Sequence, residues 1–141
     1  MKRSTDELLN ILKASRKFDD FFNKEIGELS FASLTEYLEI LIESKKLKKS
    51  EIILRGNLDK NYAYQIFNGT KTNPSRDKVL MLAFGMNLDY GETQVLLKKA
   101  KQPELYVRDP RDCVIIFCLD KQYSLIDTNE TLMGYGLDII E

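Results

Sequence analysis

The sequence predicts an all-α fold for this chain of 141 residues. Apolar residues recur three or four positions apart along most of the chain, which is the spacing of a buried helix face. Capping residues, mostly Ser and Asp, precede these stretches, and Gly or Asn follows several of them. No stretch shows the period-two alternation of a half-buried strand, so we expect essentially no β-structure.

Composition excludes several functional classes. The 43% of hydrophobic residues is enough for one modest core. No apolar run approaches the roughly 18 residues that cross a bilayer, and the N-terminus lacks the apolar stretch of a signal peptide, so we expect a cytoplasmic protein without membrane contact. Histidine is missing, and the two cysteines lie five positions apart. We therefore expect no metal site, no cofactor, no catalytic residue and no enzymatic activity, with Cys113 and Cys118 packed as small apolar side chains.

A helical N-terminal extension is expected over residues 1–30. Its first helix follows a cap at Thr5 or Asp6 and carries four apolar residues at helical spacing: Leu8, Leu9, Ile11 and Leu12. A second stretch ends near Gly27 and contains Phe18, Phe21, Phe22 and Ile26. This aromatic stretch could dock on the rest of the protein or form a dimer contact.

Residues 31–102 are expected to form a helical bundle. A capping box from Ser33 to Glu36 opens a helix that Lys45 and Lys46 close, and its apolar face holds Leu34, Tyr37, Leu38, Leu41 and Ile42. Three shorter helices follow, with predicted caps at Ser50, Asp59 and Ser75. They are expected to end at Gly56, Asn68 and Gly85.

Residues 74–136 contain an internal repeat. A shift of 35 positions places Arg76-Asp77 on Arg111-Asp112. The same shift places Glu92-Thr93-Gln94 on Asp127-Thr128-Asn129. Since one register matches two separated patches, each copy is predicted to form a helical hairpin.

The second copy belongs to a C-terminal hairpin over residues 103–141. The turns of the two hairpins are expected near Leu88 and Tyr123. A hairpin cannot bury its apolar face alone, so the C-terminal one should pack on the bundle as a platform. The junction 108–112 is expected to enter a helix capped by Asp109, or alternatively to bind a partner's carboxylate.

The net charge of −1 hides an uneven distribution. Residues 45–78 hold nine basic and three acidic side chains, a net charge of +6. The flanking residues 1–44 and 79–141 have net charges of −3 and −4. A local positive excess raises the potential over one surface and attracts a polyanion there.

The positive segment contains two short helices joined by Asn57-Leu58-Asp59, the tight connection of a helix-turn-helix. The spacing predicts that the two helices pack together through Ile53, Leu58, Ala63 and Ile66. Five side chains of the second helix are then expected to face outward: Lys60, Asn61, Tyr64, Gln65 and Asn68. Asn and Gln are suited to reading adenine edges. Phosphate contacts are expected from the flanking basic residues Lys48, Lys49, Lys71 and Arg76.

The stretch from Leu58 to Gly69, followed by Pro74-Ser75, resembles the recognition helix and exit of the Xre/Cro-repressor helix-turn-helix family. The resemblance covers about residues 33–100 and implies a five-helix bundle of the lambda-repressor type whose third helix reads bases. It implies base contacts from Lys60, Asn61, Tyr64 and Gln65. It also implies DNA-backbone contacts from Lys49, Ser50, Asn68 and Lys71. Phe67 could join Tyr62 and Tyr64 in an aromatic contact patch, or belong to the core.

The expected function is that of a sequence-specific DNA-binding transcriptional regulator, with the recognition helix 60–68 in the major groove of double-stranded DNA. A homodimer is expected, because one short helix reads only a few base pairs. The alternative is a non-catalytic protein–protein interaction module on a repurposed helix-turn-helix bundle. Such a module would use the aromatic patch or bind a protein partner through the C-terminal hairpin.

Overall fold

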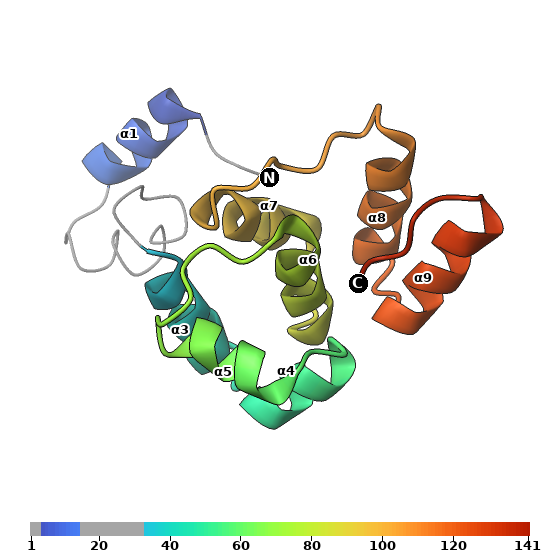
Figure 1. Ribbon diagram of the computed structural model, residues 1–141. Coiled ribbons are helices and arrows are strands. Elements are labelled where there is room, and N and C mark those ends of the chain that lie inside the picture. The colour runs from blue at the N-terminus through green and yellow to red at the C-terminus, as the bar shows by residue number, and fades with distance from the viewer. Residues whose placement is uncertain (1–3, 15–32) are drawn as a thin grey trace.

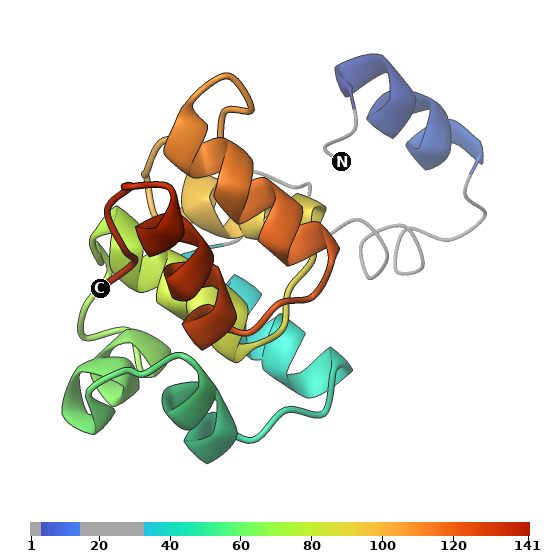
Figure 2. The ribbon, with the colours of Figure 1, turned by 90° about the vertical axis from the view of Figure 1, so that its right-hand side faces the viewer.

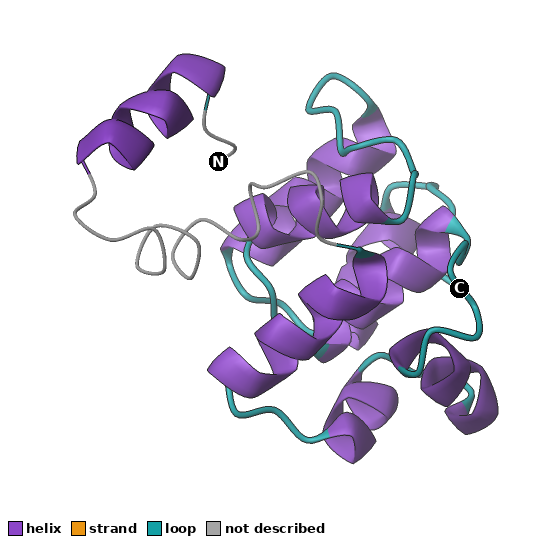
Figure 3. Ribbon diagram, turned by 90° about the vertical axis from the view of Figure 1, so that its left-hand side faces the viewer, coloured by secondary structure: helices purple, strands orange, loops and turns teal. Residues whose placement is uncertain are grey.

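The computed structural model describes residues 4–14 and 33–141. These residues form eight α-helices and no strand (Figures 1 and 3). The all-α prediction is therefore confirmed for the described part of the chain. None of the described helices is long and apolar enough to cross a membrane.

The first helix, α1, covers Thr5–Ala14. Its cap differs from the prediction, because the hydroxyl of Ser4 accepts the N–H of Glu7 at 3.1 Å. Thr5 is already helical, so the capping position falls one residue before it. The predicted second stretch, residues 18–27, lies outside the described residues.

The remaining helices are α3 (Leu34–Ser44), α4 (Lys49–Arg55), α5 (Lys60–Phe67), α6 (Arg76–Gly85), α7 (Tyr90–Lys99), α8 (Pro110–Asp120) and α9 (Leu125–Gly134). The predicted ends of α3 to α6 agree with these within two residues. Figure 1 shows α6 at the centre, with α3, α4 and α5 on one side and α8 and α9 on the other.

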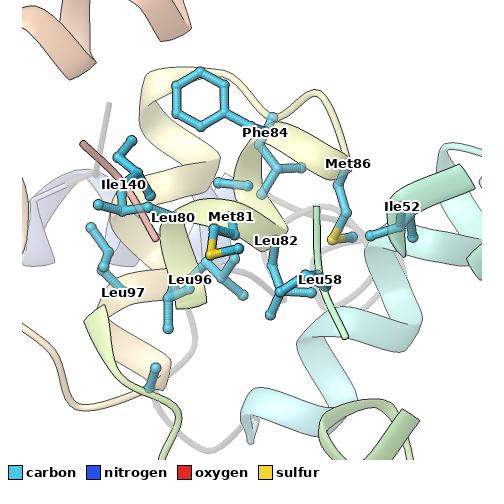
Figure 4. Close-up of a cluster of buried hydrophobic side chains, with 14 of the residues drawn as sticks. Ile52, Leu58, Leu80, Met81, Leu82, Phe84, Met86, Leu96, Leu97 and Ile140 are labelled. Carbon is cyan, nitrogen blue, oxygen red and sulfur yellow. The ribbon is translucent and has the colours of Figure 1, made fainter. Parts of the chain in front are cut away.

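Helix α6 is buried on nearly all sides. Every residue from Val79 to Gly85 is buried, so this helix has no wide polar stripe. Figure 4 shows its Leu80 and Leu82 among side chains from other elements, including Ile52 and Ile140. One hydrophobic core contains residues from each helix between α3 and α9. The C-terminal hairpin therefore packs on the preceding helices, as the repeat predicts.

Side-chain caps start most of the helices. Six capping side chains each accept a hydrogen bond from the backbone N–H three residues later: Ser33, Asp59, Ser75, Asp89, Asp109 and Ser124. Helix α4 is different, since Lys48 occupies its cap position without a side-chain cap bond, and the predicted cap at Ser50 is wrong. Helix α3 ends with a hydrogen bond that the N–H of Leu47 donates to the carbonyl of Ile42 at 2.9 Å. Lys48 is already extended after this closure, so α4 begins two residues earlier than predicted.

The substitution Asp59→Ala is expected to lower the free energy of unfolding by about 1 kcal/mol. Its carboxylate accepts the N–H of Tyr62 at 3.0 Å, and this bond would be lost. Ser50→Ala is the matched control and should change stability by less than about 0.5 kcal/mol. Urea unfolding followed by circular dichroism compares both variants with the parent. Equal losses from the two substitutions would contradict this assignment of the caps.

Four helix pairs, α3–α4, α4–α5, α6–α7 and α8–α9, turn at the same kind of corner. Four residues connect each pair, and the second of the four is left-handed: Lys46 (φ 53°), Asn57 (φ 50°), Asn87 (φ 54°) and Gln122 (φ 59°). The next N–H reaches back five residues, as from Leu58 to the carbonyl of Ile53 at 3.0 Å. The tight turn predicted at Asn57 is therefore present, but backbone geometry alone does not distinguish it from the other three corners.

The hydrogen bonds reproduce the predicted 35-residue repeat. Arg76 donates to the carbonyls of Pro103 and Glu104, and Arg111 donates to those of Asp138 and Ile139. The amides of Gln94 and Asn129 each bind both backbone groups of a residue eleven positions later, which is Leu105 in the first copy and Ile140 in the second.

Two ion pairs join the repeated hairpins. Arg76 donates to both carboxylate oxygens of Asp112, at 2.9 and 2.8 Å. Arg111 donates to both oxygens of Asp77, with its shortest bond at 3.0 Å. Each arginine thus pairs with the aspartate of the other copy. Arg111 is therefore engaged within the chain, which disfavours the alternative that the 108–112 junction binds a partner's carboxylate.

The two cysteines lie in different environments. Cys118 is buried, as predicted, and burial raises the pKa of its thiol despite a hydrogen bond with Thr128. Cys113 is exposed, which corrects the prediction that both are packed. It lies one helical turn before Phe117, which is also exposed, on the outer face of α8.

Candidate nucleic-acid interface

The corner between α4 and α5 is fixed by buried apolar side chains. Ala63 and Ile66 of α5 and Leu58 of the turn are buried, as the spacing predicts. In α4 the fully buried residue is Ile52, whereas the predicted Ile53 is only partly buried against the core. The reason lies in the position of α4, which packs mainly on α6. The corner therefore has the close packing that could present α5 as a rigid unit.

Phe67 belongs to the core and not to a surface aromatic patch. Its side chain is 3% exposed, and its ring meets that of Tyr64 edge to face, with the ring centroids 6.1 Å apart. The ammonium of Lys49 lies 5.6 Å from the ring centre. Of the two alternatives left open by the sequence, Phe67 therefore takes the second and packs in the core.

The outward face of α5 is polar. Lys60, Asn61, Tyr64 and Asn68 are exposed and Gln65 is half-buried, so the face predicted from the periodicity is present. The side chains of Lys60, Asn61 and Gln65 form no hydrogen bond or ion pair with any described residue. Asn68 caps the end of α5, and its side-chain oxygen accepts the N–H of Thr70 at 2.9 Å.

Basic side chains border this face at both ends. Lys48 and Ser50 are exposed at the start of α4. Lys49 lies beside them, and its ammonium is 3.5 Å from Glu39 in a pair whose two side chains are 37% and 52% exposed. Exposed ion pairs of this kind contribute little to stability, so a phosphate could replace Glu39 as the partner of Lys49 with little loss of free energy.

Beyond the end of α5, two lysines lie against the ring of Tyr62. The ammonium of Lys71 is 5.6 Å from the ring centre and that of Lys78 is 5.9 Å from it. Burial raises the pKa of the Tyr62 hydroxyl, an effect partly offset by a hydrogen bond that its oxygen accepts from the backbone N–H of Ser75. Lys78 was not among the contacts expected from the sequence. The sequence contained a sign of this contact, because Lys78 is the third residue of the helix that Ser75 caps and therefore lies in its first turn.

Arg76 does not belong with these cations. Its guanidinium donates to Asp112 and to two backbone carbonyls, and its side chain is 23% exposed. Few of its donors remain for a phosphate. We therefore correct the sequence prediction and remove Arg76 from the candidate DNA-backbone contacts.

Charge and the engagement of polar side chains distinguish the four corners. Residues 48–78 carry seven basic and three acidic side chains, a net charge of +4, whereas residues 109–134 carry two and five, a net charge of −3. The first turn of α7 is engaged internally, because Glu92 pairs with Lys45 at 3.1 Å and Gln94 is buried. The second helix of the α3–α4 pair, α4, has its exposed Glu51 and Arg55 paired with each other. Among the second helices of the four pairs, only α5 combines an unengaged polar face with a positive surround.

The described residues contain no cluster of three or more His, Cys, Asp or Glu side chains able to hold a metal ion. Comparison with protein-family models, with curated proteins and with solved structures finds no match for this chain.

Proposed function

We propose that the protein is a sequence-specific DNA-binding transcriptional regulator of the Xre/Cro helix-turn-helix type, acting in the cytoplasm by occupying a site and without catalysis. In this proposal α3 to α7 are the five-helix bundle and α5 enters the major groove. One observation supports it most. Of four corners with the same backbone turn, only the α4–α5 corner leads into a helix whose outward polar side chains bind nothing else described and that has lysines on both sides.

The side chains of α5 match the chemistry of base edges. Asn61 and Gln65 can each donate to and accept from adenine, and Lys60 can donate to guanine. Tyr64 is exposed on the same helix, and its hydroxyl can donate and accept. These four are the proposed base contacts.

The proposed DNA-backbone contacts surround this helix. They are Lys48, Lys49, Ser50, Asn68 and Lys71, with Lys78 added and Arg76 removed. Four lysines on phosphates predict a slope of about −3.5 for the logarithm of the binding constant against the logarithm of salt concentration, for each protomer. A homodimer would place two copies of α5 in major grooves about 34 Å apart, on a two-fold operator.

Selection from random or genomic DNA, followed by titration at two salt concentrations, tests this function. Gln65→Ala should weaken binding to the selected site by about 10-fold or more, and binding to scrambled DNA much less. Lys71→Ala should weaken both equally and reduce the salt slope by about 0.9. Lys121→Ala, an exposed lysine at the end of α8, is the matched control and should change neither. Equal binding by the parent and the Gln65→Ala variant would refute base reading by α5.

The second candidate is a protein–protein interaction module. It is favoured by the C-terminal hairpin, where Phe117, Ile126, Met133 and Tyr135 are each at least half exposed. Such exposure is typical of a contact surface. A complete absence of salt-dependent DNA binding would leave this candidate as the better one.

A further inference from the structure

The C-terminal hairpin exposes five large apolar side chains, which we call the hairpin surface: Phe117, Tyr123, Ile126, Met133 and Tyr135. Ile126 and Met133 are 71% and 66% exposed and lie two turns apart on one face of α9. Figure 2 shows α9 on the outside of the molecule, where no described helix covers it. A single exposed apolar residue is ordinary, but several on one hairpin are typical of a contact surface.

Carboxylates lie among the apolar side chains of α9. Glu130 stands between Ile126 and Met133 on the same face of the helix, since it follows the first by four residues and precedes the second by three. Asp127 is exposed directly after Ile126. No basic side chain of the described residues forms an ion pair with Glu130 or Asp127. This face of α9 therefore combines exposed apolar area with negative charge that nothing described neutralises.

The whole hairpin has the same sign of charge. Residues 109–141 carry seven acidic and two basic side chains, a net charge of −5. Both basic side chains have acidic neighbours, because Arg111 pairs with Asp77 and the ammonium of Lys121 lies 3.6 Å from Asp120. Two hairpin surfaces face to face would bring like charges together, so a two-fold dimer through this face is disfavoured. Nucleic acid and anionic lipid are disfavoured for the same reason.

We propose that the hairpin surface binds a basic amphipathic helix of another protein. The apolar side chains of such a helix would cover Ile126 and Met133, whose separation of two turns matches the repeat of an apolar stripe on a facing helix. Its lysines or arginines would lie against Glu130 and Asp127, which gives the complementary charge. Figure 1 shows α9 and α5 on opposite sides of α6, so this binding does not depend on the proposed contact of α5 with DNA.

Fluorescence anisotropy of a labelled synthetic helix, titrated with the full-length chain, tests this binding. The probe is a peptide of about 18 residues with leucine along one face and lysine on the other, and the control peptide has glutamate in place of each lysine. At low salt the chain is expected to bind the lysine peptide at least about 10-fold more tightly than the glutamate peptide. Equal affinity for the two peptides, or no binding of the lysine peptide, would overturn the proposal.

Two pairs of substitutions locate the contact. Ile126→Ser should weaken binding of the lysine peptide about 10-fold, whereas Leu54→Ser, at an 81% exposed position of α4, should leave it unchanged. Glu130→Lys should weaken it about fivefold, whereas Glu43→Lys makes the same change of net charge at an exposed position of α3 and should have a much smaller effect. All four native side chains are exposed, so the variants are expected to fold like the parent. Equal effects within each pair would mean that the peptide binds elsewhere, contrary to the proposal.

Sedimentation over a range of concentrations distinguishes a second copy of the chain from another protein as the occupant. The parent and the Ile126→Ser variant are expected to have the same oligomeric state, whatever that state is. A dimer of the parent that dissociates in Ile126→Ser would overturn the proposal, because the hairpin surface would then be covered by a second copy.

Discussion

Asp112→Ala is expected to lower the free energy of unfolding by about 4 kcal/mol, the largest effect predicted for any single side chain of this protein. The carboxylate of Asp112 is 6% exposed and accepts from both terminal nitrogens of Arg76 and from the N–H of Tyr106. Its removal leaves a largely buried guanidinium and a backbone N–H without their acceptor. The two repeated hairpins would lose one of the two ion pairs that join them.

Chemical unfolding of Asp112→Ala and of Glu51→Ala measures this difference. Glu51 pairs with Arg55 at 3.5 Å on the surface of α4, with both side chains about half exposed. Its removal should cost less than about 0.5 kcal/mol. The double variant Arg76→Met/Asp112→Leu should be less destabilised than the sum of its single variants, because it leaves no buried charge alone. A loss for Asp112→Ala no larger than that for Glu51→Ala would contradict the role assigned to this pair.

The same ion pair predicts a pH dependence of stability. Burial alone would raise the pKa of Asp112, but Arg76 and the N–H of Tyr106 hold it below its usual value. Between the lowered folded pKa and the ordinary unfolded pKa near 4, the unfolded chain binds more protons than the folded chain. The contribution of Asp112 is therefore fully present above about pH 5 and is lost as the pH falls through the folded pKa. Unfolding titrations between pH 3 and pH 7 should show a smaller acid loss for Asp112→Asn than for the parent.

The helices and the outward face of α5 could be predicted because their causes are local. A cap such as Asp59 acts on an N–H three residues away, and the left-handed turn at Asn57 lies within the corner it forms. The exposure of Lys60, Asn61 and Tyr64 follows from the helical period once Ala63 and Ile66 face inward. Such relations are contained in a few consecutive residues, so a single sequence reveals them.

The role of Arg76 could not be predicted in the same way. Its partner lies 36 residues further on, and a basic residue beside a positive segment is equally consistent with a phosphate contact. The repeat carried a usable signal, since an Arg-Asp pair at the same place in both copies permits a reciprocal exchange of partners. The predicted cap at Ser50 was wrong for a different reason. A hydroxyl at the right distance from an apolar stretch predicts a cap, but the closure of α3 at Leu47 starts α4 earlier.

Gly85→Ala is expected to lower the free energy of unfolding by about 3 kcal/mol, because α4 and α6 cross with their backbones in contact. A Cβ on Gly85 would overlap the carbonyl oxygen of Ile52 and lie 3.2 Å from the nitrogen of Gly56. A Cβ on Gly56 would lie 2.6 Å from the carbonyl oxygen of Met81, so Gly56→Ala should cost about 2 kcal/mol. In both cases the obstacle is backbone, which cannot rotate away.

Gly134→Ala is the matched control, since an added Cβ there meets no described atom within 4 Å. It should stabilise the protein by up to about 0.5 kcal/mol through helix propensity. The close crossing of α4 and α6 also bears on DNA binding, because α4 carries Lys48 and Lys49 and positions α5 through the corner. A variant that remains folded with α4 displaced, such as Gly56→Ala at low temperature, should bind the selected DNA site more weakly, whereas Gly134→Ala should bind it like the parent. Unchanged stability and unchanged DNA affinity in Gly56→Ala would mean that α4 can move off α6 without cost, contrary to the close approach of the two backbones.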